Sequence, residues 1–175
     1  MKTLKELMAL LPISGAKYYC SEIARLNDYD KNRLILLSNK LLNAGCNNPL
    51  PWAFGEITEN VPQYSRFVIL KSFYDIINNP DGILIDAELF DDNIRKKIDR
   101  IKNVLGEADT YKMLQAYARA VISGVVNMLD EGNCTAEIDK VSWELYEIDG
   151  NGIRTGRTIK NLHEDFFDFE EDAEQ

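Results

Sequence analysis

The segment Glu147-Ile148-Asp149-Gly150-Asn151-Gly152 contains the residue types of a calcium-binding loop. Asp149 and Asn151 would take the third and fifth positions of that loop, and Gly152 the sixth. The twelfth position must supply a bidentate acid, and here it is Thr158. The glycines also lack the Gly-x-x-x-x-Gly-Lys spacing of a phosphate-binding loop. We therefore predict a tight turn, with no metal and no cofactor.

Nucleophilic catalysis has one candidate base, because histidine occurs only at His163. His163 precedes Glu164 and Asp165, and this setting predicts a solvent-facing side chain. Carboxylates are plentiful, but an acid–base pair needs two carboxylates in different environments, and the sequence indicates no such difference. We assign no catalytic, cofactor-binding or metal-ligating residue.

The cysteines and the apolar runs indicate the compartment. The three cysteines are odd in number and far apart, which predicts neither a disulfide framework nor a paired metal site; they are Cys20, Cys46 and Cys134. Glu6 and Pro12 interrupt the region where a secretory signal needs an apolar core. No apolar run approaches the roughly 20 residues that cross a bilayer. We expect a cytoplasmic protein with no membrane span.

The charge of the chain is concentrated in its C-terminal part. The chain has a formal net charge of −9, with 20 basic and 29 acidic residues. Residues 107–175 account for 6 of the basic and 16 of the acidic residues, a net of −10, which leaves +1 for residues 1–106. A protein with this charge repels nucleic acid at long range and attracts basic protein surfaces.

The acidic end from Glu164 to Gln175 also contains three phenylalanines, Phe166, Phe167 and Phe169. A segment that only needed solvation would not carry side chains that each gain about 2 kcal/mol on burial. We therefore expect part of this tail to dock on its own chain or on a partner. A solvated terminus is the alternative.

Six segments show apolar residues at helical spacing, at about residues 4–11, 14–26, 30–44, 62–77, 92–105 and 109–129. In the last of these, we expect Val121 to face the core, so that Val121→Asp would cost about 3 to 5 kcal/mol. Ala116, Ala120 and Gly124 form a row four residues apart that would let a neighbouring helix approach closely. The helix at 92–105 carries five cations from Arg95 to Lys102, which predict an exposed basic face.

The remaining segments predict loops and strands. Cys46–Val61, with two prolines ahead of Trp52 and Phe54, predicts a long aromatic loop. Residues 83–85 predict a brief extended segment after the Asn-Asn-Pro-Asp-Gly break. Residues 140–148 and 153–159 flank a glycine-rich turn and predict a β-hairpin.

Together these elements predict a mainly α fold, a helical bundle-like body of about five to six helices with a small C-terminal β-hairpin; α+β is the alternative class. We expect one domain, residues 1–163, which includes the hairpin near 140–159. The acidic, Phe-containing tail at 164–175 follows it.

The function that fits this layout is a cytoplasmic acidic protein-interaction module. We expect an inhibitor or immunity-type protein that covers a basic partner such as a nuclease, and not an enzyme. The candidate partner-binding residues are aromatic anchors and the acids around them, namely Trp143, Tyr146, Glu164, Asp165, Phe166, Phe167, Asp168, Phe169 and Glu170.

Two alternatives stay open. The first is an enzyme of unknown reaction with a site near the 46–61 loop, beside Asp75 or Glu56, which buried carboxylates converging on a cleft would favour. The second is a structural or regulatory protein whose acidic tail docks on its own basic helix at 95–102.

Overall fold

A computed structural model describes residues 1–132 and 142–169 of the chain. This part contains nine helices and one two-stranded antiparallel sheet, which confirms the mainly α class with a small C-terminal hairpin. The helices are α1 (Leu4–Met8), α2 (Ile13–Arg25), α3 (Asp28–Asn43), α4 (Pro49–Glu59), α5 (Gln63–Ile77), α6 (Pro80–Ala87), α7 (Ile94–Leu105), α8 (Glu107–Glu131) and α10 (Leu162–Phe166). The strands are β1 (Leu145–Ile148) and β2 (Arg154–Ile159).

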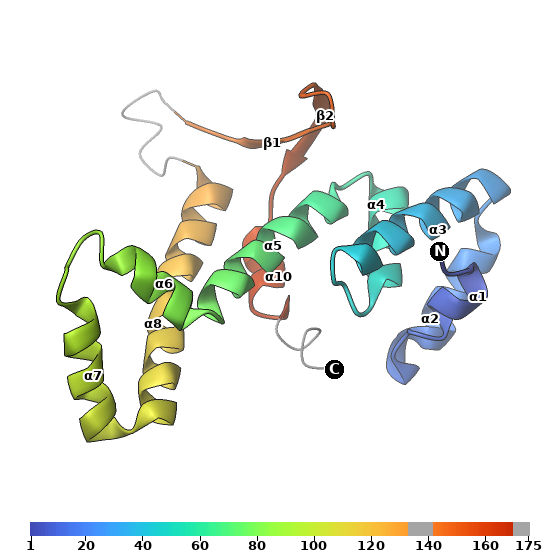
Figure 1. The fold of residues 1–175 in the computed structure, drawn as a ribbon. Helices are drawn as coiled ribbons and strands as arrows, with labels where there is room; N and C mark the ends of the chain where they lie inside the picture. Colours follow the sequence, from blue (N-terminus) through green and yellow to red (C-terminus); the bar gives the residue numbers. More distant parts are fainter. Residues whose placement is uncertain (133–141, 170–175) are drawn as a thin grey trace.

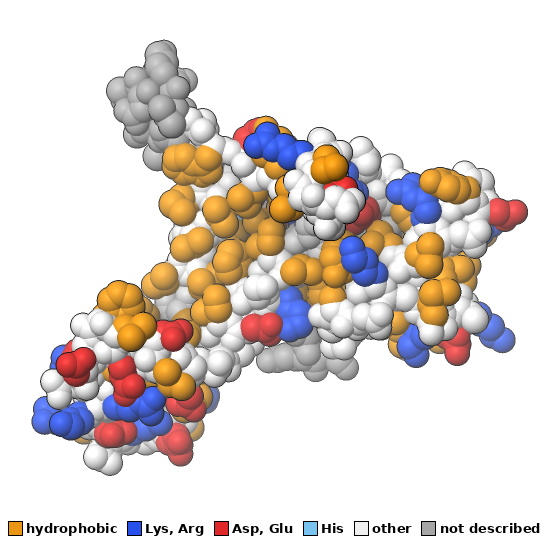
Figure 2. Space-filling model, turned by 45° about the horizontal axis from the view of Figure 1, so that its top comes forward, with side chains coloured by type: hydrophobic (Ala, Val, Ile, Leu, Met, Phe, Trp, Pro, Cys, Tyr) orange, Lys and Arg blue, Asp and Glu red, His pale blue; other side chains and the backbone are white. Residues whose placement is uncertain are grey.

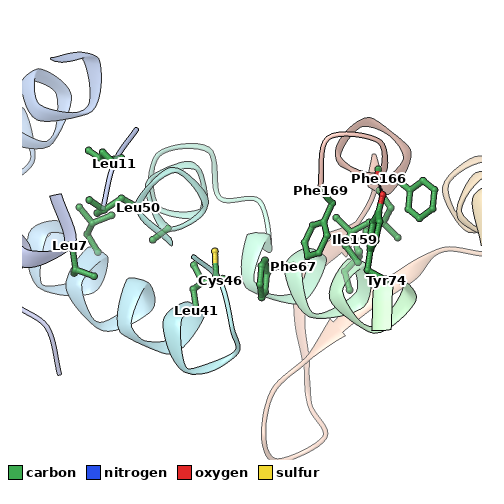
Figure 3. Close-up of a cluster of buried hydrophobic side chains, with 14 of the residues drawn as sticks. Leu7, Leu11, Leu41, Cys46, Leu50, Phe67, Tyr74, Ile159, Phe166 and Phe169 are labelled. Atoms are coloured by element: carbon green, nitrogen blue, oxygen red, sulfur yellow. Dashed lines mark hydrogen bonds between the residues drawn. The ribbon is translucent and has the colours of Figure 1, made fainter. Parts of the chain in front are cut away.

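The molecule is elongated, with α1 to α4 at one end, α6 to α8 at the other, and α5 running between them (Figure 1). One cluster of buried side chains follows this axis. It begins near Leu7 of α1, passes Phe67 in the middle and reaches Phe166 of α10 (Figure 3). The C-terminal helix therefore completes a core that the N-terminal helices begin.

The long aromatic loop predicted at 46–61 is wrong, because most of it forms α4. Pro49 and Pro51 are compatible with this helix because they lie in its first turn, where the missing N–H groups have no intrahelical acceptor. Beyond them, Leu50 and Ala53 turn inward and are fully buried. The prolines thus start a helix that also packs Trp52 against the edge of the core.

The extended segment predicted at 83–85 is also wrong, because these residues belong to α6. The Asn-Asn-Pro-Asp sequence ends α5 and starts the next helix at once. The Asn79 side chain accepts a hydrogen bond from the Gly82 N–H at 3.1 Å, with Pro80 in the first turn. The residues that predict the end of one helix therefore also supply the N-cap of the next helix.

The inner face predicted for the longest helix is wrong as well. In α8, Thr110 and Val126 are buried, and Ile122 packs against the core cluster. Val121 is 48% exposed. The inner side of the helix is not the side of Val121, because α8 is apolar on more than one side and spacing alone cannot identify the inner one. Val121→Asp is consequently no longer expected to cost 3 to 5 kcal/mol.

The described part of the acidic tail, residues 164–169, docks on its own chain, where α10 packs against α5 and α8. Phe166 is 1% exposed, and the Tyr74 hydroxyl donates a hydrogen bond to the Phe166 carbonyl at 2.5 Å. Two cations of the basic helix α7 have other partners, since Arg95 pairs with Glu88 and Lys97 pairs with Asp91. Over residues 164–169, the contacts that the sequence suggested for the tail are thus made with α5 and α8 and not with the basic helix.

The predicted β-hairpin is confirmed, with Leu145 opposite Ile159 in the antiparallel pair, but its first strand begins only at Leu145. Residues 140 and 141 of the predicted first strand lie outside the described residues. In the turn, the Asp149 carboxylate accepts hydrogen bonds from the Ile153 and Asn151 N–H groups, at 2.9 and 2.8 Å. These backbone hydrogen bonds hold the pKa of Asp149 below its usual value. Asp149 therefore stabilises the turn itself.

Candidate protein-interaction site

A guanidinium joins the hairpin to the helical body. Arg157 of β2 lies between two carboxylates, with Nη1 2.9 Å from Glu56 of α4 and Nη2 2.6 Å from Glu147 of β1. Both carboxylate side chains are 9% exposed. The hydroxyls of Ser65 and Thr155 also donate to Glu147, at 2.7 and 2.8 Å. We call Glu56, Glu147 and Arg157 the Arg157 clamp.

Hydrogen bonding dominates the electrostatics of the Arg157 clamp. Burial alone would raise the pKa of Glu147, but the hydrogen bonds from Ser65, Thr155 and Arg157 outweigh it and hold the pKa below the ordinary value. Burial alone would lower the pKa of Arg157, and its two carboxylate partners instead raise it. The two buried carboxylates near residues 46–61 thus converge on a guanidinium, and the arrangement is a structural anchor for the hairpin.

A pocket of about 290 Å³ opens where α4, α5 and the C-terminal segment meet. Trp52 and Pro51 come from α4, and Gln63 starts α5. Asp165 of α10 and the residues that follow that helix complete the lining, which is Pro51, Trp52, Gln63, Asp165, Asp168 and Phe169. We call it the acidic–aromatic pocket, because two carboxylates and two aromatic rings share it.

Aromatic packing fixes the wall of the acidic–aromatic pocket. Phe169 is 7% exposed, and its ring stacks on Tyr74 with centroids 5.1 Å apart. Trp52 meets Phe169 edge-on at 6.3 Å and Phe67 edge-on at 5.6 Å. The burial of Phe169 therefore holds the backbone segment that carries Asp168 next to α4. Aromatic pairs of this kind contribute about 0.5 to 1.5 kcal/mol each beyond the burial of their area.

The two carboxylates of the acidic–aromatic pocket differ in environment. Asp165 is half-buried, and Nη2 of the buried Arg66 lies 2.6 Å from it. Burial raises the pKa of Asp165, the Arg66 charge opposes that rise, and Glu164 and Asp168 add to it. Asp168 is exposed. The pocket therefore places one partly desolvated carboxylate and one solvated carboxylate beside aromatic rings.

A second pocket of about 200 Å³ shares Trp52 and Phe169 with the first. Its floor is formed by Phe67 and Tyr74, and Lys71 and Asp75 line it as a pair 2.7 Å apart. Because the two pockets have a common aromatic wall, they form adjoining hollows along α5. Asp75, which was a candidate of the enzyme hypothesis, is exposed and paired with the lysine one helical turn before it.

The structure brings together only some of the predicted partner-binding residues. Asp165, Asp168 and Phe169 line the acidic–aromatic pocket, whereas Phe166 is in the core. Phe167 is 64% exposed, and Glu164 is exposed too. Glu170 lies outside the described residues.

Trp143 and Tyr146 do not line this pocket and belong to the hairpin region. The Trp143 indole N–H donates to the Met128 carbonyl at 3.1 Å. The Tyr146 hydroxyl donates to Glu144 at 2.7 Å, and the Arg154 guanidinium lies 4.4 Å from the centre of the Tyr146 ring. Polar contacts thus hold Trp143 on the end of α8 and Tyr146 within the hairpin region.

Sequence reasoning missed Pro51, Trp52 and Gln63 as pocket residues. The signal that could have found Trp52 is its place on the apolar side of a helix started by two prolines. Its pairing with Phe169 had no sequence signal, because the two residues are 117 positions apart in the chain.

Within residues 1–132 and 142–169, no cluster of three or more His, Cys, Asp or Glu side chains is arranged to hold a metal ion. None of the helices in this same part of the chain has the length and hydropathy needed to span a membrane. No protein-family model, no curated protein and no solved structure matches the chain.

Proposed function

We propose that this protein is an interaction module that binds a basic protein partner by accepting a lysine or arginine side chain in the acidic–aromatic pocket. The observation that carries the proposal is the placement of Asp165 and Asp168 in one pocket with Trp52 and Phe169. Carboxylates bind guanidinium and ammonium groups through charge-assisted hydrogen bonds. Aromatic faces attract the same cations, by about 0.5 to 2 kcal/mol.

The raised pKa of Asp165 supports this use of the pocket. Burial raises that pKa because Asp165 has lost solvation that Arg66 alone does not replace. A second cation in the pocket would stabilise the ionised carboxylate further. The side chain of a partner, delivered from the open side near Asp168, supplies such a charge.

The acidity of the whole chain supports an inhibitory or immunity-type role in the cytoplasm against a basic surface such as that of a nuclease. A net charge of −9 speeds the encounter with a basic surface and disfavours acidic competitors. The sequence adds Glu170, Glu171, Asp172 and Glu174 directly after the pocket residue Phe169. In this proposal the pocket supplies the specific contact and the surrounding acids supply the steering.

The pocket is tested directly by titration with N-acetylarginine amide, followed by the indole N–H signals in NMR spectra. The chain has two tryptophans, Trp52 in the pocket and Trp143 beside the hairpin. We expect a saturable shift of the Trp52 signal, with Trp143 as an internal control. Titration with N-acetylglutamine amide checks that the positive charge is required. Equal shifts of both indoles, or none, would contradict the proposal.

The partner is tested by capture from the native cell with two matched variants of the purified chain. Asp168→Lys removes a pocket carboxylate, and Asp86→Lys makes the same charge change at an exposed position on α6. We expect Asp86→Lys to retain the basic protein that the wild type retains, and Asp168→Lys to lose it. Equal retention by both variants would contradict binding through the pocket. Equal loss by both would show that net charge alone determines the interaction.

A further inference from the structure

The second pocket, which adjoins the acidic–aromatic pocket, has a floor of fixed aromatic rings. Phe67 and Tyr74 of α5 are 4% and 5% exposed. The Phe169 ring contacts both of them, with centroids 5.4 and 5.1 Å apart, and Figure 3 shows the three rings along this side of the core. The Tyr74 hydroxyl donates to the Phe166 carbonyl. A group that enters the pocket therefore meets aromatic rings and not a free hydroxyl.

The charges at the second pocket neutralise each other. Nζ of Lys71 lies 2.9 and 2.7 Å from the two carboxylate oxygens of Asp75. A second cation would meet the charge of Lys71, and an anion would meet that of Asp75. Charged side chains are also fewer over the middle of the molecule, where α5 runs, than at the α7 end (Figure 2). The second pocket therefore favours a neutral group, in contrast to the acidic–aromatic pocket.

The size and the rim of the second pocket indicate what the neutral group is. The volume of about 200 Å³ is below the roughly 300 to 1,000 Å³ of sites that bind drug-sized molecules, and it suits one large side chain. Aromatic rings attract one another beyond the area that they bury. Asn47 and Asn78, both exposed, line the pocket and offer amide groups to a peptide backbone.

We propose that the second pocket receives an aromatic side chain of the same basic partner whose lysine or arginine enters the acidic–aromatic pocket. This inference rests on the proposed function and adds the residue that accompanies the cation. Trp52 and Phe169 line both pockets, with ring centroids 6.3 Å apart, so that one short segment can occupy the two. In an extended segment, side chains two positions apart point to the same side and lie about 7 Å apart. The partner segment thus has one residue between its aromatic and its cationic residue.

Tripeptides with blocked ends test the pairing. The probes are arginine-glycine-phenylalanine and its reverse order, each compared with versions that carry alanine or leucine in place of phenylalanine. We expect the better order to bind about tenfold more tightly than its alanine version, and the leucine version to gain less. In NMR titrations of the full chain, the backbone N–H signals of Gly45 and Asn78 report on the second pocket, and that of Gln63 on the acidic–aromatic pocket.

A change of charge at the rim tests where the second side chain lies. Asp75→Lys places two cations at the second pocket, and Asp86→Lys makes the same change on α6. A tripeptide with glutamate in place of phenylalanine should bind Asp75→Lys severalfold more tightly than it binds Asp86→Lys. Equal affinity for the two variants would overturn the placement of this side chain in the second pocket.

The two proposals fail in different ways. If N-acetylarginine amide shifts the Trp52 indole signal but phenylalanine adds no affinity in either order, the inference about the second pocket is overturned and the proposed function stands. A leucine version as tight as the phenylalanine version would overturn the aromatic preference. If N-acetylarginine amide does not bind, the proposed function is contradicted, and the pairing that rests on it is overturned with it.

Discussion

At the scale of single residues, the Arg157 clamp shows how a few buried charges fix an element that the hydrophobic core barely reaches. The hairpin places Ile159 in the buried cluster but exposes Ile148 and Ile153. Glu147 contacts Ser65 of α5 and Arg157 contacts Glu56 of α4. Hydrogen-bonded charges therefore attach the hairpin where apolar contacts are few.

Arg157→Leu should lower the free energy of unfolding by about 3 to 5 kcal/mol, because it leaves two buried carboxylates without their cation. Urea unfolding followed by circular dichroism measures this. Arg154→Leu on the same strand is the control, since Arg154 is exposed and contacts the exposed Tyr146 ring. Its cost should be about 1 kcal/mol or less. Equal losses for the two variants would show that the clamp does not act as a buried pair.

The stability contributed by Glu147 should disappear in acid. Its folded pKa is held below the ordinary value of 4.5, so the unfolded chain binds the proton more readily. The contribution is complete above pH 4.5 and is lost as the pH falls through the folded pKa. Unfolding of wild type and Glu147→Gln, compared from neutral pH downward, should show a difference that shrinks on acidification. A difference that is constant with pH would contradict this assignment.

The folded-state pKa of the pocket carboxylate Asp165 is shifted in the opposite direction to that of Glu147, and cation binding should depend on pH through it. Burial raises this pKa above 3.8, and a bound cation would favour the ionised form. Binding of N-acetylarginine amide should therefore strengthen as the pH rises through the pKa of Asp165 and then level off. The NMR titration of the Trp52 indole, repeated across this pH range, measures it. An affinity independent of pH would argue that Asp165 does not contact the ligand.

At the scale of elements, α10 is only five residues long but closes the core and builds the acidic–aromatic pocket. A helix this short has little stability of its own. Its position depends on the burial of Leu162 and Phe166 and on the hydrogen bond from Tyr74. The docked part of the tail is thus held by tertiary contacts.

Neighbouring phenylalanines provide the test for α10. Phe166→Ala should cost about 3 to 5 kcal/mol, because the ring is 1% exposed and its removal leaves a cavity. Phe167→Ala, at a residue 64% exposed, should change stability by about 0.5 kcal/mol or less. Chemical denaturation of the two variants measures the difference. Similar costs would mean that α10 is not docked as described.

At the scale of the whole molecule, the net charge of −9 should govern how fast a basic partner is met. Charge steering is screened within about 8 Å at physiological ionic strength. The association rate with the captured partner should therefore fall as salt is added, while the dissociation rate changes less. Surface plasmon resonance at several salt concentrations separates the two rates.

The same matched variants separate steering from specific contact. Asp168→Lys and Asp86→Lys each change the net charge from −9 to −7, because one negative charge is replaced by one positive charge. Both should slow association to a similar extent, but only Asp168→Lys should also speed dissociation. Equal dissociation rates would place the specific contact elsewhere on the molecule.

The sequence by itself determined the fold class, six of the helices and the hairpin, because these depend on local signals. The turn at Asp149 is an example, since its hydrogen bonds join residues within four positions of one another. The basic face of α7 is another: Arg95, Lys96, Lys97 and Arg100 are exposed as predicted while Ile98 is buried, because this helix is apolar on one side only. Proline and asparagine residues led to a wrong prediction where the same short segment both ends one helix and begins the next, as in the segment before α6.

Only the tertiary structure decided which apolar surfaces meet. Both sides of α8 carry apolar residues, and contact with α5 and α10 selects Ile122 and Val126 and leaves Val121 exposed. The acidic–aromatic pocket requires Trp52 of α4 to lie beside Phe169, and nothing near either residue encodes that pairing. Burial depends on which surfaces meet in the folded protein. The periodicity of a helix predicts the direction in which a side chain points, but it does not predict which element lies there.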